Sequence, residues 1–442
     1  MQDKTTVMVI GSGGREHAVV RKLRESPYVG QIYILPGNVG IKLDQACAPV
    51  ECLPIAATAF DEISTFAKQH EVGFAVITPD DPLCLGLTDR LESIGIPSFG
   101  PSKSAARIEG SKSFAKELMT RRHIPTASYQ VFDDMERALD YVRKSPLPVV
   151  IKADGLALGK GVVVAETLEE AEAAIKECML DRRFGEAGQR IVVEEYLKGV
   201  EASLLLFTDG DAYRLMPAAM DHKRAFDGDV GPNTGGMGTI TPHPLITPEM
   251  RNEIERTIIK PTLAAMRDEG CPFKGCLFIG LMLTNAGPKV IEYNCRFGDP
   301  EAQSILALLE SDLFEIMKAV RSGTLAQADV RFKGSAASCV VAASGGYPGS
   351  YTKGVSINGL QQYLCASEMN NYSPKVWIDC AGVGEVRGEV VTTGGRVFGI
   401  TATGSTINEA LREAYTALTT ISFDGMQYRT DIGAKVLEVM NG

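Results

Sequence analysis

Short apolar runs alternate with amphipathic runs over the first hundred residues of the chain. This alternation predicts strands separated by helices, which fold into a doubly wound parallel sheet with helices on its faces. Ligands of such sheets bind at the carboxyl ends of the strands. The predicted strands are residues 6–10, 31–35, 74–77 and 97–99, and the predicted helices are residues 15–24, 60–70 and 83–94.

The middle of the chain mixes strands and helices, and it ends in two apolar strands joined by a turn. Residues 231–238 contain four glycines, and we expect them to form no packed element and to be mobile or to bind a ligand. The predicted helices are residues 102–122, 135–145 and 247–269, and the predicted strands are residues 129–132, 148–152, 162–165, 190–195, 201–207, 275–283 and 289–295.

The last part of the chain is rich in short strand patterns. We expect a small antiparallel domain that helps to wall a site and that contributes no catalytic residue. Its predicted strands are residues 336–343, 376–381, 385–391 and 396–402, and its predicted helix is residues 406–421.

Length, charge and cysteine content narrow the class of protein. At ~100–200 residues per domain, the 442 residues indicate two to four domains. The net charge of −10 argues against a nucleic-acid partner, and no apolar run reaches the ~18 residues of a membrane span. Ten cysteines without a CxxC pair, and an N-terminus without a signal-peptide pattern, predict a cytoplasmic protein.

A glycine-rich turn follows the first predicted strand. Gly11, Gly13 and Gly14 precede a helix, where backbone N–H groups and the helix dipole favour an anion. A dinucleotide fingerprint requires glycine at the position of Glu16, so NAD binding is not expected. An anion site and a purely structural turn are both compatible with this pattern.

Lys152 ends an apolar strand, where its charge is costly unless an anion pairs with it. The glycine-rich residues 155–161 suit a flexible flap over phosphates. They are not a Walker A loop, because no Ser or Thr follows Lys160 and a strand comes next where a helix is required.

A short polar link at residues 196–199 joins two predicted strands. It suits a clamp around a purine base, with Glu201 placed for a ribose hydroxyl. A β-hairpin without special function fits the same pattern, and both interpretations are open.

Glu292, Asn294 and Arg296 occupy alternate positions of the strand at residues 289–295 and beyond, so they share one face. A carboxylate and an amide oxygen suit a hard cation such as Mg²⁺, and the arginine suits a further anion. The alternative is a strand end whose polar side chains meet solvent. Cys295 is expected to face away from the other three and not to act as a nucleophile.

Several motifs together resemble one family along nearly the whole chain. They are Gly-Ser-Gly-Gly-Arg-Glu-His17, Glu-Gly-Ser-Lys112, Lys152-Ala-Asp-Gly155, Glu-Glu195, Asp-His-Lys-Arg224, Gly-Pro-Asn-Thr-Gly-Gly-Met-Gly238 and Asn-Cys-Arg-Phe-Gly-Asp-Pro-Glu301. In these motifs the chain resembles the phosphoribosylamine–glycine ligases, the glycinamide ribonucleotide synthetases of purine biosynthesis, which are members of the ATP-grasp superfamily.

The resemblance implies an N-terminal α/β domain at residues 1–104, an ATP-grasp domain at residues 105–330 with a small α/β lid at about 124–195, and a β-rich domain at residues 331–442. It implies a ligase that makes glycyl phosphate from ATP and glycine and transfers the glycyl group to 5-phosphoribosylamine. ATP with Mg²⁺ or Mn²⁺ is implied, in a monomer or homodimer. The chemistry needs positioning and charge neutralisation, and no protein nucleophile.

Residue roles follow from the same resemblance. The implied catalytic residues are Arg296, Asp221 and Lys223, and the implied metal ligands are Glu292 and Asn294. The implied ATP contacts are Lys112, Lys152, Gly159, Gly161, Glu194, Glu195, Tyr196, Leu197 and Glu201. The implied contacts with glycine and phosphoribosylamine are Gly11, Gly13, Gly14, Arg15, Asn38, Asp80, Asn233 and Gly235.

Two departures from the family pattern are visible. Residues 280–283 offer no further metal-binding acid of the kind that many ATP-grasp enzymes carry, and Asp80 stands where the pattern has the longer glutamate. A ligase that acts on another carboxylate or amine, and a non-catalytic nucleotide-binding protein, are the alternative functions.

Overall fold

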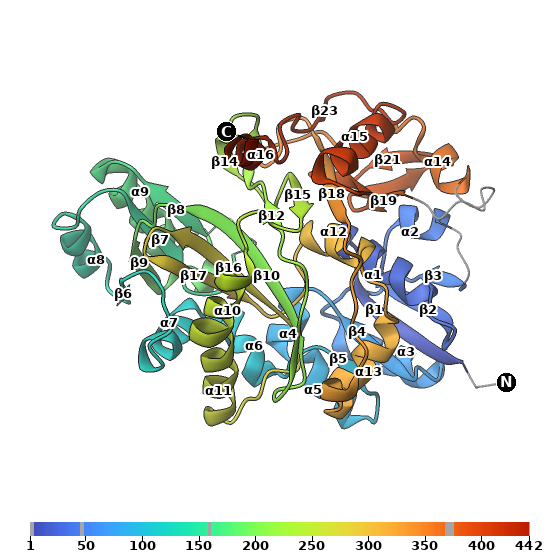
Figure 1. The fold of residues 1–442 in the computed structure, drawn as a ribbon, viewed down its shortest axis with the longest axis horizontal. Helices are drawn as coiled ribbons and strands as arrows, with labels where there is room; N and C mark the ends of the chain where they lie inside the picture. The colour runs from blue at the N-terminus through green and yellow to red at the C-terminus, as the bar shows by residue number, and fades with distance from the viewer. Residues whose placement is uncertain (1–3, 45–47, 158–160, 367–374, 442) are drawn as a thin grey trace.

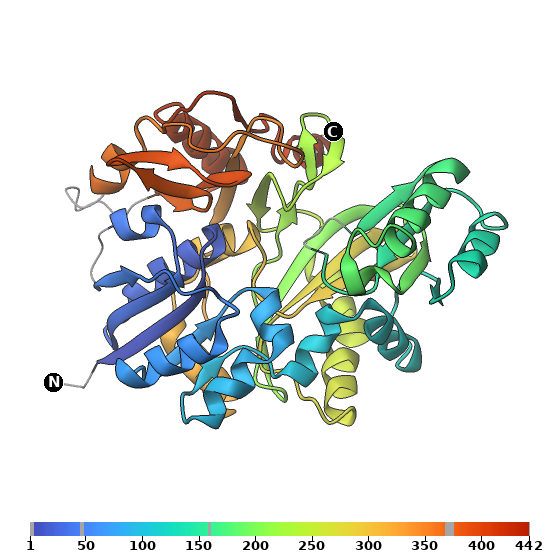
Figure 2. The ribbon, with the colours of Figure 1, turned by 180° about the vertical axis from the view of Figure 1, so that it is seen from behind.

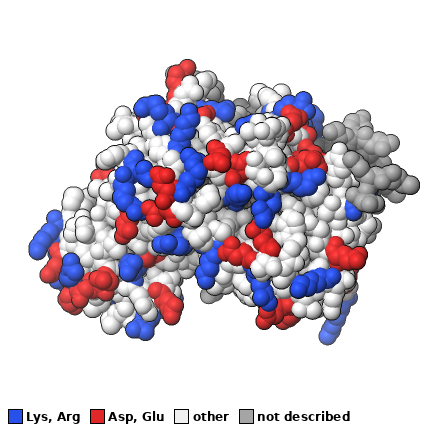
Figure 3. Space-filling model, turned by 90° about the horizontal axis from the view of Figure 1, so that it is seen from below, with Lys and Arg blue, Asp and Glu red and all other residues white. Residues whose placement is uncertain are grey.

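The computed structural model of the chain describes residues 4–44, 48–157, 161–366 and 375–441. The N-terminal sheet and the C-terminal strands lie at one end of the long axis, and a small four-stranded sheet lies at the other (Figures 1 and 2). On the face shown in Figure 3, basic and acidic side chains are intermingled. Among the described helices, none combines the length and the apolarity needed to cross a bilayer.

The N-terminal sheet has five strands in the order β3-β2-β1-β4-β5, and all pair in parallel. Alternate residues of β1 enter two cores: Val7 and Val9 pack on one face and Met8 and Ile10 on the other. The strands are β1 (Thr5–Gly11), β2 (Val29–Pro36), β3 (Val50–Cys52), β4 (Phe74–Ile77) and β5 (Ser98–Phe99). The helices are α1 (Gly14–Arg24), α2 (Val39–Leu43), α3 (Phe60–Gln69), α4 (Asp80–Leu85) and α5 (Leu87–Ser93).

Two predicted helices are each broken in two. The prediction of one helix at residues 83–94 was wrong because Gly86, with φ of 99°, ends α4 in the left-handed region before α5 begins. The run at residues 102–122 is divided into α6 (Lys103–Gly110) and α7 (Lys112–Arg121). Ser111 lies between them in an extended conformation, and its side chain accepts a hydrogen bond from the N–H of Phe114 at the start of α7.

The small sheet has the order β6-β9-β7-β8 and carries α8 and α9 on one side, with a separate hydrophobic core. Helix α9 was not predicted from the pattern of the sequence, although Thr167 and Glu170 form a capping box at its start. The elements are β6 (Tyr129–Phe132), α8 (Met135–Val142), β7 (Val149–Ala153), β8 (Val162–Ala165), α9 (Leu168–Met179) and β9 (Ile191–Glu195).

The central sheet has the order β11-β10-β16-β17, and its strands pair antiparallel. The hairpin interpretation of residues 190–207 was therefore wrong: β9 belongs to the small sheet and β10 to the central sheet, so residues 196–199 link two sheets. The elements are β10 (Val200–Thr208), β11 (Tyr213–Leu215), β16 (Gly275–Thr284), β17 (Gly287–Asn294) and the helix made of α10 (Pro248–Ile254), a π-helical segment (Glu255–Ile259) and α11 (Lys260–Asp268).

The glycine-rich segment at residues 231–238 is more ordered than expected. It contributes β14 (Val230–Asn233), which pairs with β13 (Arg224–Phe226), and it ends where β15 (Gly238–Thr241) begins. The first half of the segment therefore forms a strand that was not expected, although all four residues of β14 are exposed, as expected for an element that is not packed. Strand β15 pairs with β12 (Met220–Asp221) and with the C-terminal sheet.

The C-terminal sheet has the order β12-β15-β18-β22-β19, with β23 beside β18. The strand predicted at residues 385–391 is instead a hairpin of β20 and β21, because Arg387 and Gly388 both adopt positive φ between them. The elements are α12 (Glu301–Ala307), α13 (Leu313–Ser322), β18 (Ala336–Ser344), α14 (Leu360–Ala366), β19 (Val376–Cys380), β20 (Val383–Val386), β21 (Glu389–Thr392), β22 (Arg396–Gly404), α15 (Ile407–Leu418), β23 (Met426–Gln427) and α16 (Ala434–Asn441).

Candidate active site

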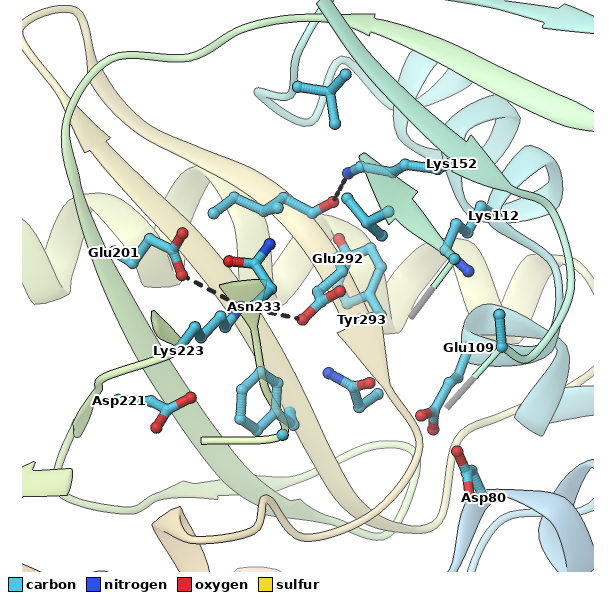
Figure 4. Close-up of a pocket in the computed structure, with 18 of the residues that line it drawn as sticks. Asp80, Glu109, Lys112, Lys152, Glu201, Asp221, Lys223, Asn233, Glu292 and Tyr293 are labelled. Atoms are coloured by element: carbon cyan, nitrogen blue, oxygen red, sulfur yellow. Dashed lines mark hydrogen bonds and ion pairs between the residues drawn. The ribbon is translucent and has the colours of Figure 1, made fainter. Parts of the chain in front are cut away.

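A cavity of about 530 Å³ lies where the small sheet, the central sheet, the N-terminal domain and the C-terminal strands meet. Lys112 and Lys152 enter it from one side, Lys223 and Asp221 from the other, and Glu292 lies between them on β17 (Figure 4). The cavity therefore brings together residues from four distant parts of the chain.

Strand β17 supplies the floor of this cavity. Glu292, Asn294 and Arg296 all line it, whereas Cys295 is fully buried and its N–H donates to Glu109 Oε2 at 2.6 Å. Gly280 on β16 pairs with Glu292, and a Cβ at that position would lie 3.0 Å from the Glu292 Cγ. The glycine thus leaves room for the carboxylate to extend along the floor.

Positive charges surround Glu292. Burial by itself raises the pKa of this carboxyl, but Lys223, Lys152 and Lys112 outweigh burial and lower it to about 2. The Nζ atom of Lys223 lies 3.6 Å from Glu292 Oε1 and 3.2 Å from Glu201 Oε2. Glu292 is consequently an anion at neutral pH.

The donor set on β17 fits a hard divalent cation with few protein ligands. Glu292 offers a carboxylate and Asn294 an amide oxygen, which accepts one hydrogen bond from Arg296 Nη2 at 3.3 Å. Within the described residues no group of three or more His, Cys, Asp or Glu side chains forms a metal cluster. A cation held here takes its other ligands from phosphate oxygens and water.

Lys112 and Lys152 are held side by side through one aspartate. Asp154, two residues after Lys152, accepts hydrogen bonds from the Ser113 N–H at 2.6 Å and from the Ser113 hydroxyl at 2.9 Å. Its carbonyl accepts from the Lys112 N–H at 2.9 Å. Asp154 therefore satisfies an N–H group in the first turn of α7, in addition to the N-cap residue Ser111, and holds the two lysines on one wall.

The wall next to the link at residues 196–199 contains a buried carboxylate between two lysines. Glu194 Oε2 lies 3.0 Å from Lys116 Nζ and 3.1 Å from Lys152 Nζ. Burial lowers the pKa of Lys116 to about 8, although the Glu194 carboxylate opposes this shift. Glu195, Tyr196 and Leu197 continue this wall.

At the opposite end of the cavity, acidic and basic side chains lie close together. Burial and the charge of Glu301 raise the pKa of Asp221 well above its usual range. Ser203 donates a hydrogen bond to Glu301 Oε1 at 2.8 Å. Burial therefore favours the protonated form of Asp221, which can donate a hydrogen bond to a substrate oxygen.

Most of the residues proposed from the sequence line the cavity, but some do not. Gly11, Gly13, Gly14 and Asn38 are absent from its lining, and Gly159 lies outside the described residues. The remainder of the proposed set lines the cavity: Arg15, Asp80, Lys112, Lys152, Gly161, Glu194, Glu195, Tyr196, Leu197, Glu201, Asp221, Lys223, Asn233, Gly235, Glu292, Asn294 and Arg296.

The glycine turn and Asn38 have structural partners. The N–H of Gly13 donates to Glu16 Oε2 at 2.5 Å, so the side-chain carboxylate of Glu16 occupies the position in which a bound anion was considered. Asn38 donates to the carbonyls of Ser12 and Cys380, at 2.8 and 2.9 Å. Only Arg15 of this turn reaches the cavity.

Sequence reasoning missed the contribution of the C-terminal strands. Arg396 donates to the Gly235 carbonyl at 2.6 Å and pairs with Asp299 Oδ2 at 2.8 Å. Tyr347 accepts a hydrogen bond from the Gly235 N–H at 3.0 Å, and both side chains line the cavity. No local pattern around Arg396 or Tyr347 signals this role, because Gly235, their shared partner, lies 161 and 112 residues away in the chain.

Comparison with known proteins agrees with this arrangement. The phosphoribosylglycinamide synthetase family models match the chain as an N domain at residues 5–109, an ATP-grasp (A) domain at residues 110–302 and a C domain at residues 337–435. A phosphoribosylamine–glycine ligase from Vibrio vulnificus is 45% identical over 432 residues, which cover 98% of each chain.

The chain is also similar in structure to solved proteins. The crystal structure of a phosphoribosylamine–glycine ligase from Thermotoga maritima has a TM-score of 0.79 at 33% identity, covering 97% of this chain and 100% of that chain. The biotin carboxylase domain of Hydrogenobacter thermophilus 2-oxoglutarate carboxylase, solved with MgADP, ADP and bicarbonate, has a TM-score of 0.72 at 16% identity, covering 97% and 92%, which shows the fold alone.

These findings confirm the predicted fold class, in which a parallel N-terminal sheet, an ATP-grasp domain and a β-rich C-terminal domain follow one another. The three family models together cover most of the chain, and the Vibrio relative matches it almost from end to end. The chain therefore belongs to the phosphoribosylglycinamide synthetase family.

Proposed function

We propose that this protein is an ATP-dependent ligase of purine biosynthesis that joins glycine to 5-phosphoribosylamine and forms glycinamide ribonucleotide, ADP and phosphate. One observation carries the proposal. The chain belongs to this family, and its fold brings five side chains from elements far apart in sequence into one cavity: Lys112, Lys152, Glu292, Asn294 and Arg296. That set combines cations for phosphate with oxygen ligands for a metal ion.

The first step transfers the γ-phosphoryl group of ATP to the carboxylate of glycine and forms glycyl phosphate. Lys112 and Lys152 neutralise and orient the phosphates, and this kind of transfer depends on positioning and charge. Mg²⁺ or Mn²⁺, held by Glu292 and Asn294, supplies further neutralisation of phosphate charge. Residues Glu194 to Leu197 hold the adenine and Glu201 the ribose.

The second step joins the amine of phosphoribosylamine to the glycyl carbonyl carbon and expels phosphate. The attacking nitrogen loses a proton to water or to the departing phosphate, and Asp221, whose protonated form burial and Glu301 favour, holds the substrates by hydrogen bonds. Arg296, Lys223, Arg15, Asp80, Asn233 and Gly235 hold the two substrates. Gly11, Gly13, Gly14 and Asn38, which the resemblance implies as substrate contacts, do not line the cavity; the Gly13 N–H donates to Glu16, whose carboxylate also pairs with Arg15.

We also propose that the chain folds into three domains, residues 1–104, 105–330 and 331–442, and that residues 124–195 form a lid. The separate hydrophobic cores of the small sheet and of the C-terminal strands support this division. Closure of the lid protects glycyl phosphate from water, and residues 158–160 of the flap predicted at residues 155–161 lie outside the described residues. We also propose a cytoplasmic location and a monomer or homodimer.

ADP release from the purified protein tests the function. The assay contains Mg·ATP and glycine, with phosphoribosylamine formed in situ from ribose 5-phosphate and ammonia. ADP that appears only with all components supports the proposal. Turnover with another carboxylate in place of glycine, or ADP that forms regardless of phosphoribosylamine, contradicts the substrate assignment.

A further inference from the structure

The hairpin of β13 and β14 carries site residues at its base but has no core of its own. Lys223 precedes β13, and Asn233 ends β14 in register with Arg224. Both Lys223 and Asn233 line the cavity. Phe226 and Val230, farther along the hairpin, are 46% and 56% exposed. Ala225 is the buried apolar residue of β13, and a two-stranded hairpin with so little apolar burial is marginally stable, so another segment must hold it.

That segment is residues 427–435, which we call the C-terminal clamp. Figure 1 shows β14 next to α16 at the C-terminus. The Thr430 N–H donates to Asp227 Oδ1 at 2.8 Å, and the Gly228 N–H donates to Asp431 Oδ2 at 2.8 Å. The clamp therefore exchanges hydrogen bonds with the turn that closes the hairpin.

Arg429 is the centre of the clamp. Its side chain is 1% exposed, and it reaches Asp431 through Nε and Nη2 at 2.7 and 2.8 Å. Its Nη1 donates to Asp229 Oδ1 at 2.8 Å and to the Arg224 carbonyl at 3.3 Å. A buried guanidinium is tolerated only with such partners, so the hairpin cannot shift without exposing or unpairing this charge.

The clamp also reaches the residue that precedes Lys223. The Gly433 N–H donates to His222 Nε2 at 2.9 Å, and the His222 N–H donates to the Gly238 carbonyl at 3.0 Å. The contacts between the C-terminal clamp and the hairpin thus extend from the turn of the hairpin to its base. None of the clamp residues 427–435 lines the cavity, so any effect on catalysis must pass through the hairpin.

We propose that Arg429 is a positioning residue: it fixes the β13–β14 hairpin so that Lys223 and Asn233 face the cavity. The consequence for catalysis rests on the proposed ligase function, whereas the mechanical role does not. Loss of Arg429 lowers kcat and raises the KM for glycine and phosphoribosylamine more than the KM for ATP, because Lys112 and Lys152 lie outside the hairpin.

Limited trypsin digestion tests the mechanical role without substrate, because Lys223 and Arg224 are cleavage sites at the base of the hairpin. In Arg429→Met, cleavage after these residues, followed by mass spectrometry, is expected to be about tenfold faster, since local opening loses charge-assisted hydrogen bonds. Arg429→Lys should be intermediate, because lysine keeps the charge and loses the planar fork. Arg412→Met, at an exposed arginine of α15, should resemble the wild type.

Asp229→Asn provides a second route if Arg429→Met fails to fold, because Arg429 keeps its pairing with Asp431 while the hairpin is loosened. Faster cleavage in this variant together with the change in kcat and KM supports the proposal. Unchanged cleavage, or faster cleavage with unchanged kinetics, overturns it. A wild type without ligase activity would refute the proposed function, and the digestion would still decide whether Arg429 holds the hairpin.

Discussion

The Nζ atom of Lys152 lies 3.1 Å from Oε2 of Glu194 on the neighbouring strand. The sequence indicated that a lysine at the end of an apolar strand needs an anion, and this carboxylate is that partner. Lys116 approaches the same oxygen at 3.0 Å, so one buried carboxylate serves two lysines. Because Lys116 is buried in this arrangement, the free energy of unfolding should depend on pH through this lysine.

The pH dependence of stability tests the environment of Lys116. Burial lowers its pKa in the folded protein from the ordinary 10.5 to about 8. Between these values the unfolded chain binds more protons, so a rise in pH favours the folded state. The free energy of unfolding of the wild type, relative to Lys116→Met, should be level below pH 8 and increase up to about pH 10.5. Urea titrations at several pH values measure this difference, and a decrease over that interval would contradict it.

Asp154 is predicted to affect nucleotide affinity through Lys112. Asp154→Ala removes a carboxylate that caps the first turn of α7 in addition to the N-cap residue Ser111, and Asp134→Ala removes the N-cap side chain of α8 on the outer side of the lid. Each loses about 1 kcal/mol of helix stability. Only Asp154→Ala should raise the KM for ATP, by about tenfold, because α7 carries Lys112 into the cavity. Equal KM values in the two variants would show that the cap does not position the lysine.

Glu292 is predicted to be essential for turnover but not for folding. Glu292→Ala should lower the rate of ADP release by about 100-fold or more, a loss typical of removing one preorganised electrostatic group. Mn²⁺ binding followed by electron paramagnetic resonance should weaken in parallel, while thermal unfolding stays cooperative. Glu310→Ala, at an exposed carboxylate, is the control. Full activity with unchanged metal dependence would refute the assignment.

Arg396 is predicted to act on the substrates rather than on ATP. Arg396→Met removes the pairing with Asp299 and the hydrogen bond to the Gly235 carbonyl. Truncating one partner of a buried charge pair costs about 2–5 kcal/mol in protein–protein interfaces, and this pair is only partly buried, so kcat/KM for phosphoribosylamine should fall by about 30-fold, at the low end of that range. Arg387→Met, in the exposed turn between β20 and β21, should leave kcat/KM unchanged. Steady-state kinetics that show an equal fall for ATP would contradict this division.

Local features of the site were predictable from the sequence. Strand alternation alone places Glu292, Asn294 and Arg296 on one face, and it turns Cys295 away from them. The alternation of strands and helices over the first hundred residues likewise determines the parallel sheet, because each crossover depends on neighbouring elements.

Other features depended on long-range contacts. The pattern of residues 190–207 is compatible with a hairpin, yet β9 and β10 join different sheets because their partners, β7 and β16, lie elsewhere in the chain. The glycine turn has the local form of an anion site, but the Glu16 carboxylate already accepts the Gly13 N–H.

Periodicity and strand geometry, which act over a few residues, determined the parallel N-terminal sheet and the shared face of Glu292, Asn294 and Arg296. The ATP-grasp domain and the roles of Lys112 and Lys152 came from the family resemblance. Only the tertiary structure decided that Arg396 and Tyr347 complete the cavity and that Arg429 clamps the hairpin. These pairings join residues about 100 to 200 positions apart. They arise from packing between domains, which no local pattern encodes.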